Sequence, residues 1–459
     1  MNFKTTGILA LVLCIGIAAV VLLNKQDVKK EAADKIEGRL VNIEADSISA
    51  IILQPSGIHC LRDSSEWKII APIETGGDKS SIEAIGNMFS WAKIERTISS
   101  DPADYHEYGL DPERGALILV HKNGTDTLYL GDKSPTGSYV FARKSGSPDV
   151  FLTTTSLQSN IEKLLFDLRD KKVVGFDKAQ VRAVDLTNRK GSFTLEKEAG
   201  EWKIRPGDYA ADESEVDKVL NRLNSERAKE FVDEDPKDLA AYGLTKPIVQ
   251  VDLLLGENRA KKTLLIGKLA GDKYYAKDES RKPVFQVDSA FVTVLNPDLY
   301  TLRRKDLADF SSSDVNRFEL EFSGQVIVCT KDTSGTWMLE QPESRKAKSW
   351  KMSTITREAS QLEVVEFVDD HPVSLAPYGL SAPQVRAKFF VNDVLELDVS
   401  LGKEKGDNIY ATVAGSPAVY LVEKKLLETW TPTIEDIAEE PEEAPADTSA
   451  DTSVDTSAD

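Results

Sequence analysis

The sequence predicts an α+β fold in which one domain occurs three times in tandem, each copy a mostly antiparallel sheet with two helices on one face. The first observation is the tripeptide Tyr-Gly-Leu, which recurs at intervals of 134 and 136 residues, each time with a proline within three residues after it. The second is a tryptophan about 40 residues before each copy, at a spacing of 135 residues. The third is the order of strand-like and helix-like runs, which is the same in all three copies. These landmark residues are Tyr108, Gly109, Leu110, Tyr242, Gly243, Leu244, Tyr378, Gly379, Leu380, Trp67, Trp202 and Trp337.

Three further landmarks follow each Tyr-Gly-Leu in a constant order. An apolar run ends in glycine, a strand with an aromatic residue comes next, and a short apolar run closes the series. The glycines are Gly131, Gly267 and Gly402, and the aromatic residues are Tyr139, Tyr275 and Tyr410. The period is far longer than the roughly 20–50 residues of solenoid repeats, so each copy is expected to have its own core. The predicted repeats span residues 46–170, 178–305 and 312–430.

Length and charge agree with this organisation. A chain of 459 residues exceeds what one hydrophobic core usually supports, and 41% hydrophobic with 29% charged residues is typical of globular domains. The net charge is −19, but the last 27 residues contain ten acidic residues and neither Lys nor Arg. An acidic chain without a basic stripe disfavours nucleic acid as a partner.

The N-terminus contains a candidate membrane helix. Gly7 to Leu23 is a run of 17 residues without a charge, flanked by lysines. As a helix it would be roughly 25 Å long, near the lower limit for a membrane span. The run ends in Val-Val-Leu-Leu-Asn, which is a poor cleavage site, so we expect an uncleaved anchor over residues 1–30 rather than a removed signal peptide. A buried soluble helix is the third alternative.

The orientation of this anchor has two interpretations. More lysines follow the run than precede it, which would place the body of the protein in the cytoplasm. The short N-terminus with Lys4 is instead typical of a signal-anchor, and long domains cross membranes regardless of flanking charge. We favour an extracytoplasmic, periplasmic body.

Strand and helix signals follow one another in each repeat. In the first repeat a hairpin is expected at Ser49–Leu53 and Gly57–Leu61, then a strand at Trp67–Ile70. A helix should follow, with Ser80 and Glu83 at capping-box spacing, and the second repeat has Asp212 and Glu215 in the same place. An acidic loop leads to Tyr-Gly-Leu. Four strands are predicted after it, at about residues 116–121, 125–130, 139–143 and 150–152.

A second helix should close each repeat. Leu157 to Leu168 has apolar residues at helical spacing, and the corresponding stretch of the second repeat, Ala290 to Leu302, should be split at Pro297. After Trp430 the composition changes to acidic residues, proline and three Asp-Thr-Ser copies. Such a segment has too few apolar residues to offset the entropy cost of ordering, so we predict a disordered tail over residues 433–459.

The Tyr-Gly-Leu element has a structural and a functional interpretation. The tyrosines could line a binding groove. The structural interpretation is that glycine supplies a backbone angle that other residues avoid, while Tyr and Leu anchor the loop on the sheet. We favour the structural interpretation, because a structural landmark must recur in each copy of a fold, and we predict positive φ at Gly109, Gly243 and Gly379.

No catalytic, cofactor-binding or metal-ligating residue stands out. His106 and His371 both lie in the loops before Tyr-Gly-Leu but at different distances from it, and no two histidines have metal-ligand spacing. Calcium binding by the acidic loops is conceivable, but none has alternating ligands with a closing glutamate. We interpret Cys60 and Cys329 as occupying non-equivalent positions, without a disulfide framework. The acidic residues of the loops are Asp101, Asp104, Asp233, Asp235, Asp369 and Asp370.

The second repeat carries the motifs of a known family most completely. It contains Trp202-Lys203-Ile204, Tyr242-Gly243-Leu244 with Pro247, and Ile266-Gly267-Lys268. With the N-terminal apolar run, this arrangement resembles a bacterial family named domain of unknown function 4340 (DUF4340), over roughly residues 46–430. The first copy departs from the pattern at Asp132 and the third at Met338.

The resemblance implies an anchored envelope protein without an established enzymatic role. Genes of such proteins often accompany those of ABC-type export systems linked to gliding motility, and no site residues are carried over. We therefore expect a non-enzymatic binding or scaffolding protein of the bacterial envelope, attached to the membrane through its N-terminal helix and accessory to a membrane protein complex. The alternative is a hydrolase of envelope polymers that uses carboxylates which the sequence does not single out.

Overall fold

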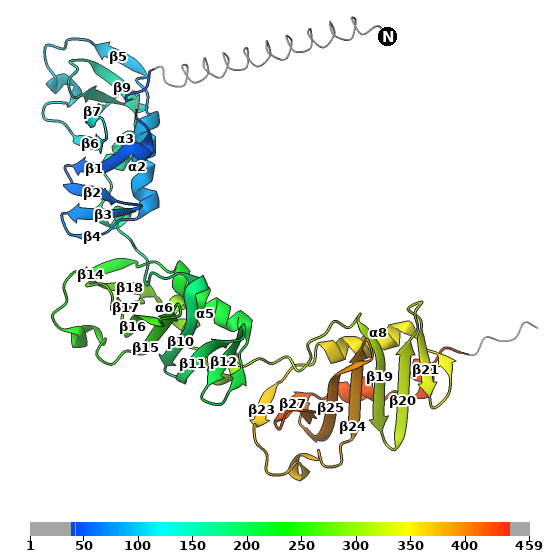
Figure 1. Cartoon of the computed structure of the whole chain (residues 1–459). Helices are drawn as coiled ribbons and strands as arrows, with labels where there is room; N and C mark the ends of the chain where they lie inside the picture. Colours follow the sequence, from blue (N-terminus) through cyan, green and yellow to red (C-terminus); the bar gives the residue numbers. More distant parts are fainter. Residues whose placement is uncertain (1–37, 42, 441–459) are drawn as a thin grey trace, which may run out of the picture. The chain divides into compact units, whose positions relative to one another are not determined.

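The computed structural model describes residues 38–41 and 43–440 and contains three nine-stranded antiparallel sheets with nine α-helices in these residues (Figure 1). The chain is therefore an α+β protein with three repeats. Its contacts divide it into two compact units. The first comprises the described residues up to Val173 with Glu226–Val232 and Phe285–Val287, and the second comprises the remainder. The first sheet lies in the first unit, and the third sheet with most of the second lies in the second unit.

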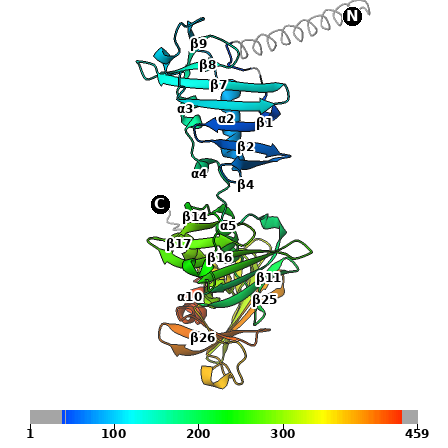
Figure 2. The same ribbon diagram turned by 90° about the vertical axis from the view of Figure 1, so that its left-hand side faces the viewer.

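The first sheet has the strand order β4-β3-β2-β1-β6-β7-β8-β9-β5, which the other two repeat (Figure 2). The predicted hairpin is β1 and β2, the tryptophan strand is β3, and the four strands after Tyr-Gly-Leu are β6 to β9. The two edge strands, β4 and β5, were not predicted, because each is at most four residues long and has no alternating pattern. The strands are β1 (Ile48–Gln54), β2 (Ile58–Asp63), β3 (Glu66–Ala71), β4 (Thr75–Gly76), β5 (Arg96–Ser99), β6 (Gly115–His121), β7 (Gly124–Lys133), β8 (Tyr139–Lys144) and β9 (Val150–Thr154).

The second and third sheets keep the same pairing and nearly the same lengths. The second contains β10 (Val181–Asn188), β11 (Gly191–Glu198), β12 (Glu201–Arg205), β13 (Tyr209–Ala210), β14 (Glu230–Asp233), β15 (Val249–Leu255), β16 (Ala260–Ala270), β17 (Lys273–Asp278) and β18 (Val284–Asp288). The third contains β19 (Val315–Phe322), β20 (Gln325–Lys331), β21 (Trp337–Gln341), β22 (Arg345–Lys346), β23 (Glu366–Asp369), β24 (Val385–Val391), β25 (Val394–Lys405), β26 (Asn408–Val413) and β27 (Val419–Glu423).

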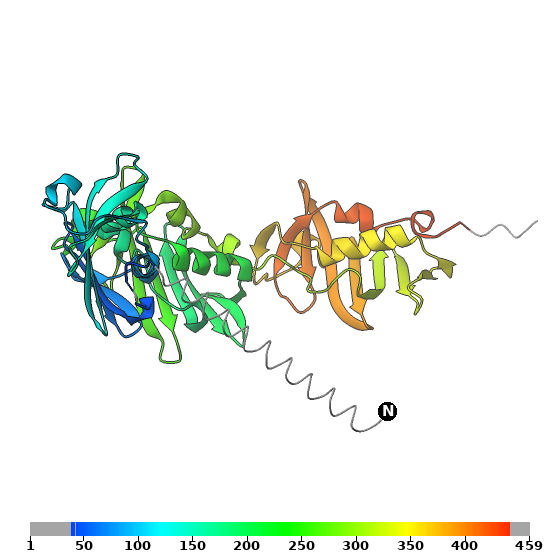
Figure 3. The ribbon, with the colours of Figure 1, turned by 90° about the horizontal axis from the view of Figure 1, so that it is seen from above.

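One long helix per repeat packs its apolar side on the sheet: α2 (Lys79–Trp91), α5 (Glu213–Ser225) and α8 (Ser349–Ser360). In the first repeat Ile82, Ile85 and Phe89 are buried in the same core as the strands, and Figure 3 shows α8 lying against the third sheet. The predicted capping box at Ser80 is wrong. Asp78 is the N-cap, and its carboxylate accepts a hydrogen bond from the backbone N–H of Ser81, because the helix begins one residue earlier than the box requires.

The second helix of each repeat is two short helices. The predicted split at Pro297 is confirmed, since α6 (Ser289–Val294) ends before it and α7 (Leu299–Leu302) begins after it. The first repeat is also split, into α3 (Ser156–Ile161) and α4 (Leu165–Leu168), although it has no proline there. The single helix predicted over Leu157 to Leu168 is therefore wrong, and Leu164 between the two parts is 68% exposed.

The third repeat extends further than predicted. After α9 (Leu426–Trp430), Thr433 caps α10 (Ile434–Ile437), and Ile437 is buried in the core beside Trp430. The tail predicted from residue 433 therefore cannot begin before residue 439, because Ile437 and Ala438 complete the core. Residues 441–459 and the predicted anchor lie outside the described residues. Within the described part of the chain, no helix is long and apolar enough to span a membrane.

Candidate functional site

Each Tyr-Gly-Leu forms a tight corner after a short 3-10 helix: η2 (His106–Tyr108), η4 (Leu239–Tyr242) and η5 (Ala376–Tyr378). The glycine that ends each helix has a φ of 63°, 70° or 73°, so the predicted positive φ is confirmed at Gly109, Gly243 and Gly379. In all three corners the glycine N–H donates to the carbonyl three residues earlier, and the leucine N–H donates to the carbonyl five residues earlier. The glycine is needed because these two bonds require a left-handed residue.

The corner rests directly on the glycine of the next landmark. A Cβ atom on Gly131, Gly267 or Gly402 would lie 2.0, 2.1 or 2.3 Å from the carbonyl oxygen of the corner tyrosine. These glycines also lie at a register shift in β7, β16 and β25. Two landmarks that the sequence shows separately are therefore the two sides of one close contact.

The corner tyrosine packs on the aromatic residue of the following strand. The ring centroids are 5.1 Å apart in the pairs Tyr242–Tyr275 and Tyr378–Tyr410. In the first repeat the partner of Tyr108 is Phe141, at 5.2 Å. The interpretation of Tyr139 as the equivalent of Tyr275 and Tyr410 is therefore wrong, because Tyr139 precedes the pairing position in β8 by two residues.

The acidic loop before each corner has structural partners. The Tyr242 hydroxyl donates to Asp233 at 2.8 Å, and this bond, together with burial, raises the pKa of the tyrosine. Burial and a 3.2 Å hydrogen bond to Asp369 likewise raise the pKa of Tyr378. His106 Nδ1 lies 2.8 Å from the carbonyl oxygen of Asp111. Among the described residues, no three His, Cys, Asp or Glu side chains are arranged to hold a metal ion.

The three tryptophans are core residues. Trp67, Trp202 and Trp337 are buried, with 2%, 7% and 5% exposure. The carbonyl of each accepts a hydrogen bond from the residue that follows the two-residue edge strand, so the tryptophan strand holds that edge in place.

The two buried cysteines also serve the core. Cys60 lies opposite Ile51 and Ile69, and Cys329 lies opposite Phe318 and Leu339. They therefore occupy equivalent positions, which corrects the interpretation from sequence, and the second repeat has Leu195 there. Burial raises the pKa of both thiols to about 12, so neither is a reactive thiolate at neutral pH.

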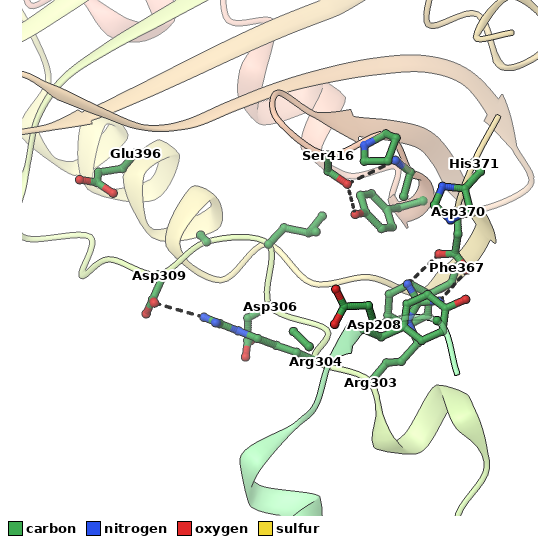
Figure 4. Close-up of a pocket in the computed structure, with 18 residues that line it drawn as sticks. Asp208, Arg303, Arg304, Asp306, Asp309, Phe367, Asp370, His371, Glu396 and Ser416 are labelled. Carbon is green, nitrogen blue, oxygen red and sulfur yellow. Dashed lines mark hydrogen bonds and ion pairs between the residues drawn. The ribbon is translucent and has the colours of Figure 1, made fainter. Parts of the chain in front are cut away.

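The largest hollow in the second unit lies where the second repeat leads into the third (Figure 4). It has a volume of about 480 Å³ and is lined by the turn around Tyr209, the segment from Arg303 to Asp309, and residues of the third repeat that include Asp370 and Ser416. Arg303 was seen in the sequence only as part of a recurring Leu-Arg pair. The signal that could have singled it out is the matching recurrence of Glu-Phe-Val-Asp at Glu230 and Glu366.

The charges in this hollow largely neutralise one another. Arg303 donates to both oxygens of Asp370, at 2.7 and 3.1 Å, and Arg304 lies 3.3 Å from Asp309. Burial would raise the pKa of the Asp370 carboxyl, but the hydrogen bonds and charge of Arg303, with a hydrogen bond from Tyr209, outweigh burial and lower that pKa. Burial and Asp370 raise the pKa of Tyr209. Asp370 is therefore ionised at neutral pH and has no proton to donate.

The same direction holds for the other carboxyl groups that are clearly perturbed in the described residues. The surroundings lower the pKa of Asp252, where Lys261 and Thr263 outweigh burial, and they lower that of Asp298 to about 2 through Thr301 and Lys190. A general acid for glycoside hydrolysis needs a carboxyl whose pKa is raised. These sites offer ion pairs and hydrogen bonds rather than acid–base chemistry.

Comparison with known proteins gave one match and one negative result. The family described as Domain of unknown function (DUF4340) matches over residues 67–206, 202–383 and 351–442. No curated protein matches the chain. Because the three matched segments together cover most of the sequence and follow the three repeats, the chain belongs to the DUF4340 family.

Proposed function

We propose that this chain is a non-enzymatic, membrane-anchored binding or scaffolding protein of the bacterial envelope. One observation carries the proposal: the landmarks that recur in the repeats contact one another within each repeat. The corner glycine, the strand glycine and the aromatic pair form one assembly in each copy. What the repeats share is thus a fold, and in the described residues no reactive group recurs with it.

The proposed binding surface is the face of each sheet that the helices leave uncovered. At matching positions of the central strand pair this face carries Ile118, Asp252 and Lys388. In the third repeat Lys388 lies 3.1 Å from Glu319, on the same face as a two-bond ion pair between Arg386 and Asp398. Because the three repeats present different side chains there, each would contact a different part of a partner.

The proposed location and partner rest on the family resemblance and on the N-terminal sequence. Residues 1–30 would form the membrane anchor, and the three repeats would lie on the extracytoplasmic side. An accessory role to an ABC-type export or gliding system is the function that this placement favours.

A pull-down from membranes tests the proposal. The full chain, tagged at its C-terminus and extracted in mild detergent, should recover a defined membrane protein. Lys388→Ala should weaken this recovery, whereas Lys351→Ala on α8 should leave it unchanged; both remove one lysine, and Glu319 keeps Arg317 as an ion-pair partner. Recovery of no membrane protein by the full chain would remove the main support for the accessory role.

The rival hypothesis is a hydrolase of envelope polymers. Its carboxylates would lie in the hollow beside Arg303, where Asp306 and Glu396 are exposed. Release of soluble fragments from purified envelope polymers, abolished by Asp306→Asn or Glu396→Gln, would favour the hydrolase over the binding protein.

A further inference from the structure

The chain between the second and third repeats is hydrogen-bonded along its length. Residues 302–307 are named the strap. Asp212 N–H donates to the Leu302 carbonyl at 2.8 Å, and Arg304 N–H donates to the Ala210 carbonyl at 2.9 Å. Leu307 N–H then donates to the Leu362 carbonyl, and Val364 N–H donates to the Lys305 carbonyl, both at 2.9 Å. The neighbouring residues Arg304 and Lys305 are thus bonded to different repeats, and no slack separates them.

Arg303 lies at the centre of the strap and contacts both repeats. Its guanidinium carbon lies 3.9 Å from the ring centroid of Tyr209 in the second repeat and 3.6 Å from that of Phe367 in the third. Both terminal nitrogens bond to Asp370 of the third repeat. The Arg303 side chain is only 9% exposed, so these charge-assisted bonds are shielded from water (Figure 4).

Apolar contacts accompany this arginine. Leu307 of the strap packs against a small cluster of the third repeat that contains Val364 and Tyr420. Tyr300, just before the strap, contacts the ring of Phe367 with centroids 5.9 Å apart, and its hydroxyl donates to the Val364 carbonyl at 3.3 Å. The strap therefore buries side chains on the third repeat as well as forming backbone bonds to it.

The first unit contains a matching arrangement. Arg169 lies 3.4 Å from the ring centroid of Phe231, and Phe166 occupies the place of Tyr300, 6.2 Å from Phe231. The backbone pattern matches as well, from the bond of Asp78 N–H to the Leu168 carbonyl to that of Ala228 N–H to Lys171.

The ends of the described chain lack one half of this arrangement each. Ala438 stands where Arg169 and Arg303 bridge to the edge strand in the other repeats. Thr97 pairs with Phe151 as Phe367 pairs with Tyr420, so threonine replaces the phenylalanine in the first repeat. In the described residues the arginine thus occurs where another repeat follows, and the phenylalanine occurs where another repeat precedes. Neither is needed for the fold of a single repeat.

We propose that Arg303, Phe367 and Asp370 form a latch that fixes the third repeat on the second, so that the two repeats move as one body. Arginine suits this role because its planar fork bonds both carboxylate oxygens while its faces stack on aromatic rings. The latch is independent of what the protein binds, so failure of the pull-down would not bear on it.

Two matched variants of the full chain in detergent test the latch. Asp370→Asn removes one partner of the Arg303 pair, and Asp398→Asn removes one partner of the Arg386 pair within the third sheet. Trypsin cleaves after Arg304 or Lys305 only when the strap is released from both repeats. We expect the wild type and Asp398→Asn to resist cleavage there, whereas Asp370→Asn and Phe367→Ala should yield a fragment beginning at Lys305 or Asp306, identified by mass spectrometry.

Amide hydrogen exchange supplies the second measurement. In Asp370→Asn the exchange of the Leu307 and Val364 amides, relative to Ala387 in β24, should become faster by about tenfold, which corresponds to about 1.4 kcal/mol of opening free energy. This ratio separates opening of the latch from general unfolding, which would accelerate all three amides alike. Arg303→Lys should behave as Asp370→Asn does, because lysine keeps the charge but loses the fork. An unchanged ratio in Asp370→Asn, or full protection in Arg303→Lys, would overturn the latch.

Discussion

At the scale of single residues, glycines hold the most demanding positions in each repeat. Gly243 has a left-handed backbone, and an added Cβ would lie 2.9 Å from the Lys268 backbone nitrogen. Gly271 has nearly the same φ, +66°, but open space around it. Gly267 has an ordinary φ but no room at all. The three positions therefore separate backbone strain from steric exclusion.

Gly243→Val should lower the free energy of unfolding of the second repeat by about 1–3 kcal/mol, toward the upper end, because it combines both effects. Gly271→Val is the control and should cost less, about 1–2 kcal/mol from the backbone angle alone. Native-state exchange of the amides in β15 reports the opening free energy of this repeat. Equal losses for the two variants would show that the corner does not press against β16.

At the scale of elements, the corner and the shifted strand form one joint. The carbonyl of Tyr242 occupies the space above Gly267, and the tyrosine ring covers Tyr275. Leu244 completes this joint by packing in a small buried cluster with Leu265 and Val284. The recurrence of tyrosine, glycine and leucine thus reflects one contact rather than three separate requirements.

Gly267→Ala should destabilise the second repeat by about 1–3 kcal/mol although its φ suits any residue, because the methyl group would overlap the Tyr242 carbonyl. Gly175→Ala, where a Cβ has open space, should be neutral. Exchange in β15 again gives the measurement. A Gly267→Ala protein as stable as the wild type would disprove the seating of the corner on this glycine.

The cap of α7 predicts a pH dependence. Asp298 accepts hydrogen bonds from the Thr301 hydroxyl and backbone N–H and lies 3.3 Å from Lys190, which lowers its pKa to about 2. A lowered carboxyl pKa stabilises the folded state above the unfolded value near 3.8, and this contribution disappears as the pH falls from about 4 to 2.

Asp298→Ala should therefore cost about 0.5–2 kcal/mol at neutral pH, the usual range for an N-cap, and progressively less below about pH 4. Thr301→Val, which removes one of the two donors, should reproduce part of the loss. Chemical denaturation of each variant across this pH range checks the trend. A difference between wild type and Asp298→Ala that grows on acidification would contradict the assignment.

At the scale of the whole molecule, the first repeat begins well after the predicted anchor. Leu40 N–H donates to the Ala92 carbonyl, and Ile94 N–H donates to the Gly38 carbonyl, so the leading segment pairs with the repeat just as the strap residues do. Leu40, Val41 and Ile43 are buried in the first core.

Deleting residues 1–30 should consequently yield a protein that stays in solution without detergent and keeps its fold, because this deletion spares the leading segment. Deleting residues 1–44 is the matched control and should destabilise the first repeat, since it removes three buried apolar side chains. Sedimentation without detergent and exchange of the amides in β1 distinguish the two. Aggregation of the shorter deletion would place the N-terminal run in the core instead of in a membrane.

The sequence by itself determined the triplication, the α+β class, most strands and the positive φ of three glycines. These follow from local signals: alternation within a strand, helical spacing, turn residues, and a glycine whose backbone angle is set by its immediate neighbours. Tertiary structure alone decided that Phe141 rather than Tyr139 pairs with Tyr108, that Cys60 and Cys329 are equivalent, and that α10 completes the third core. It also decided that Arg303 joins two repeats. Its partners Tyr209 and Asp370 lie 94 and 67 residues away in the chain, and such pairings leave no local pattern because they depend on which edges the folded sheets bring together.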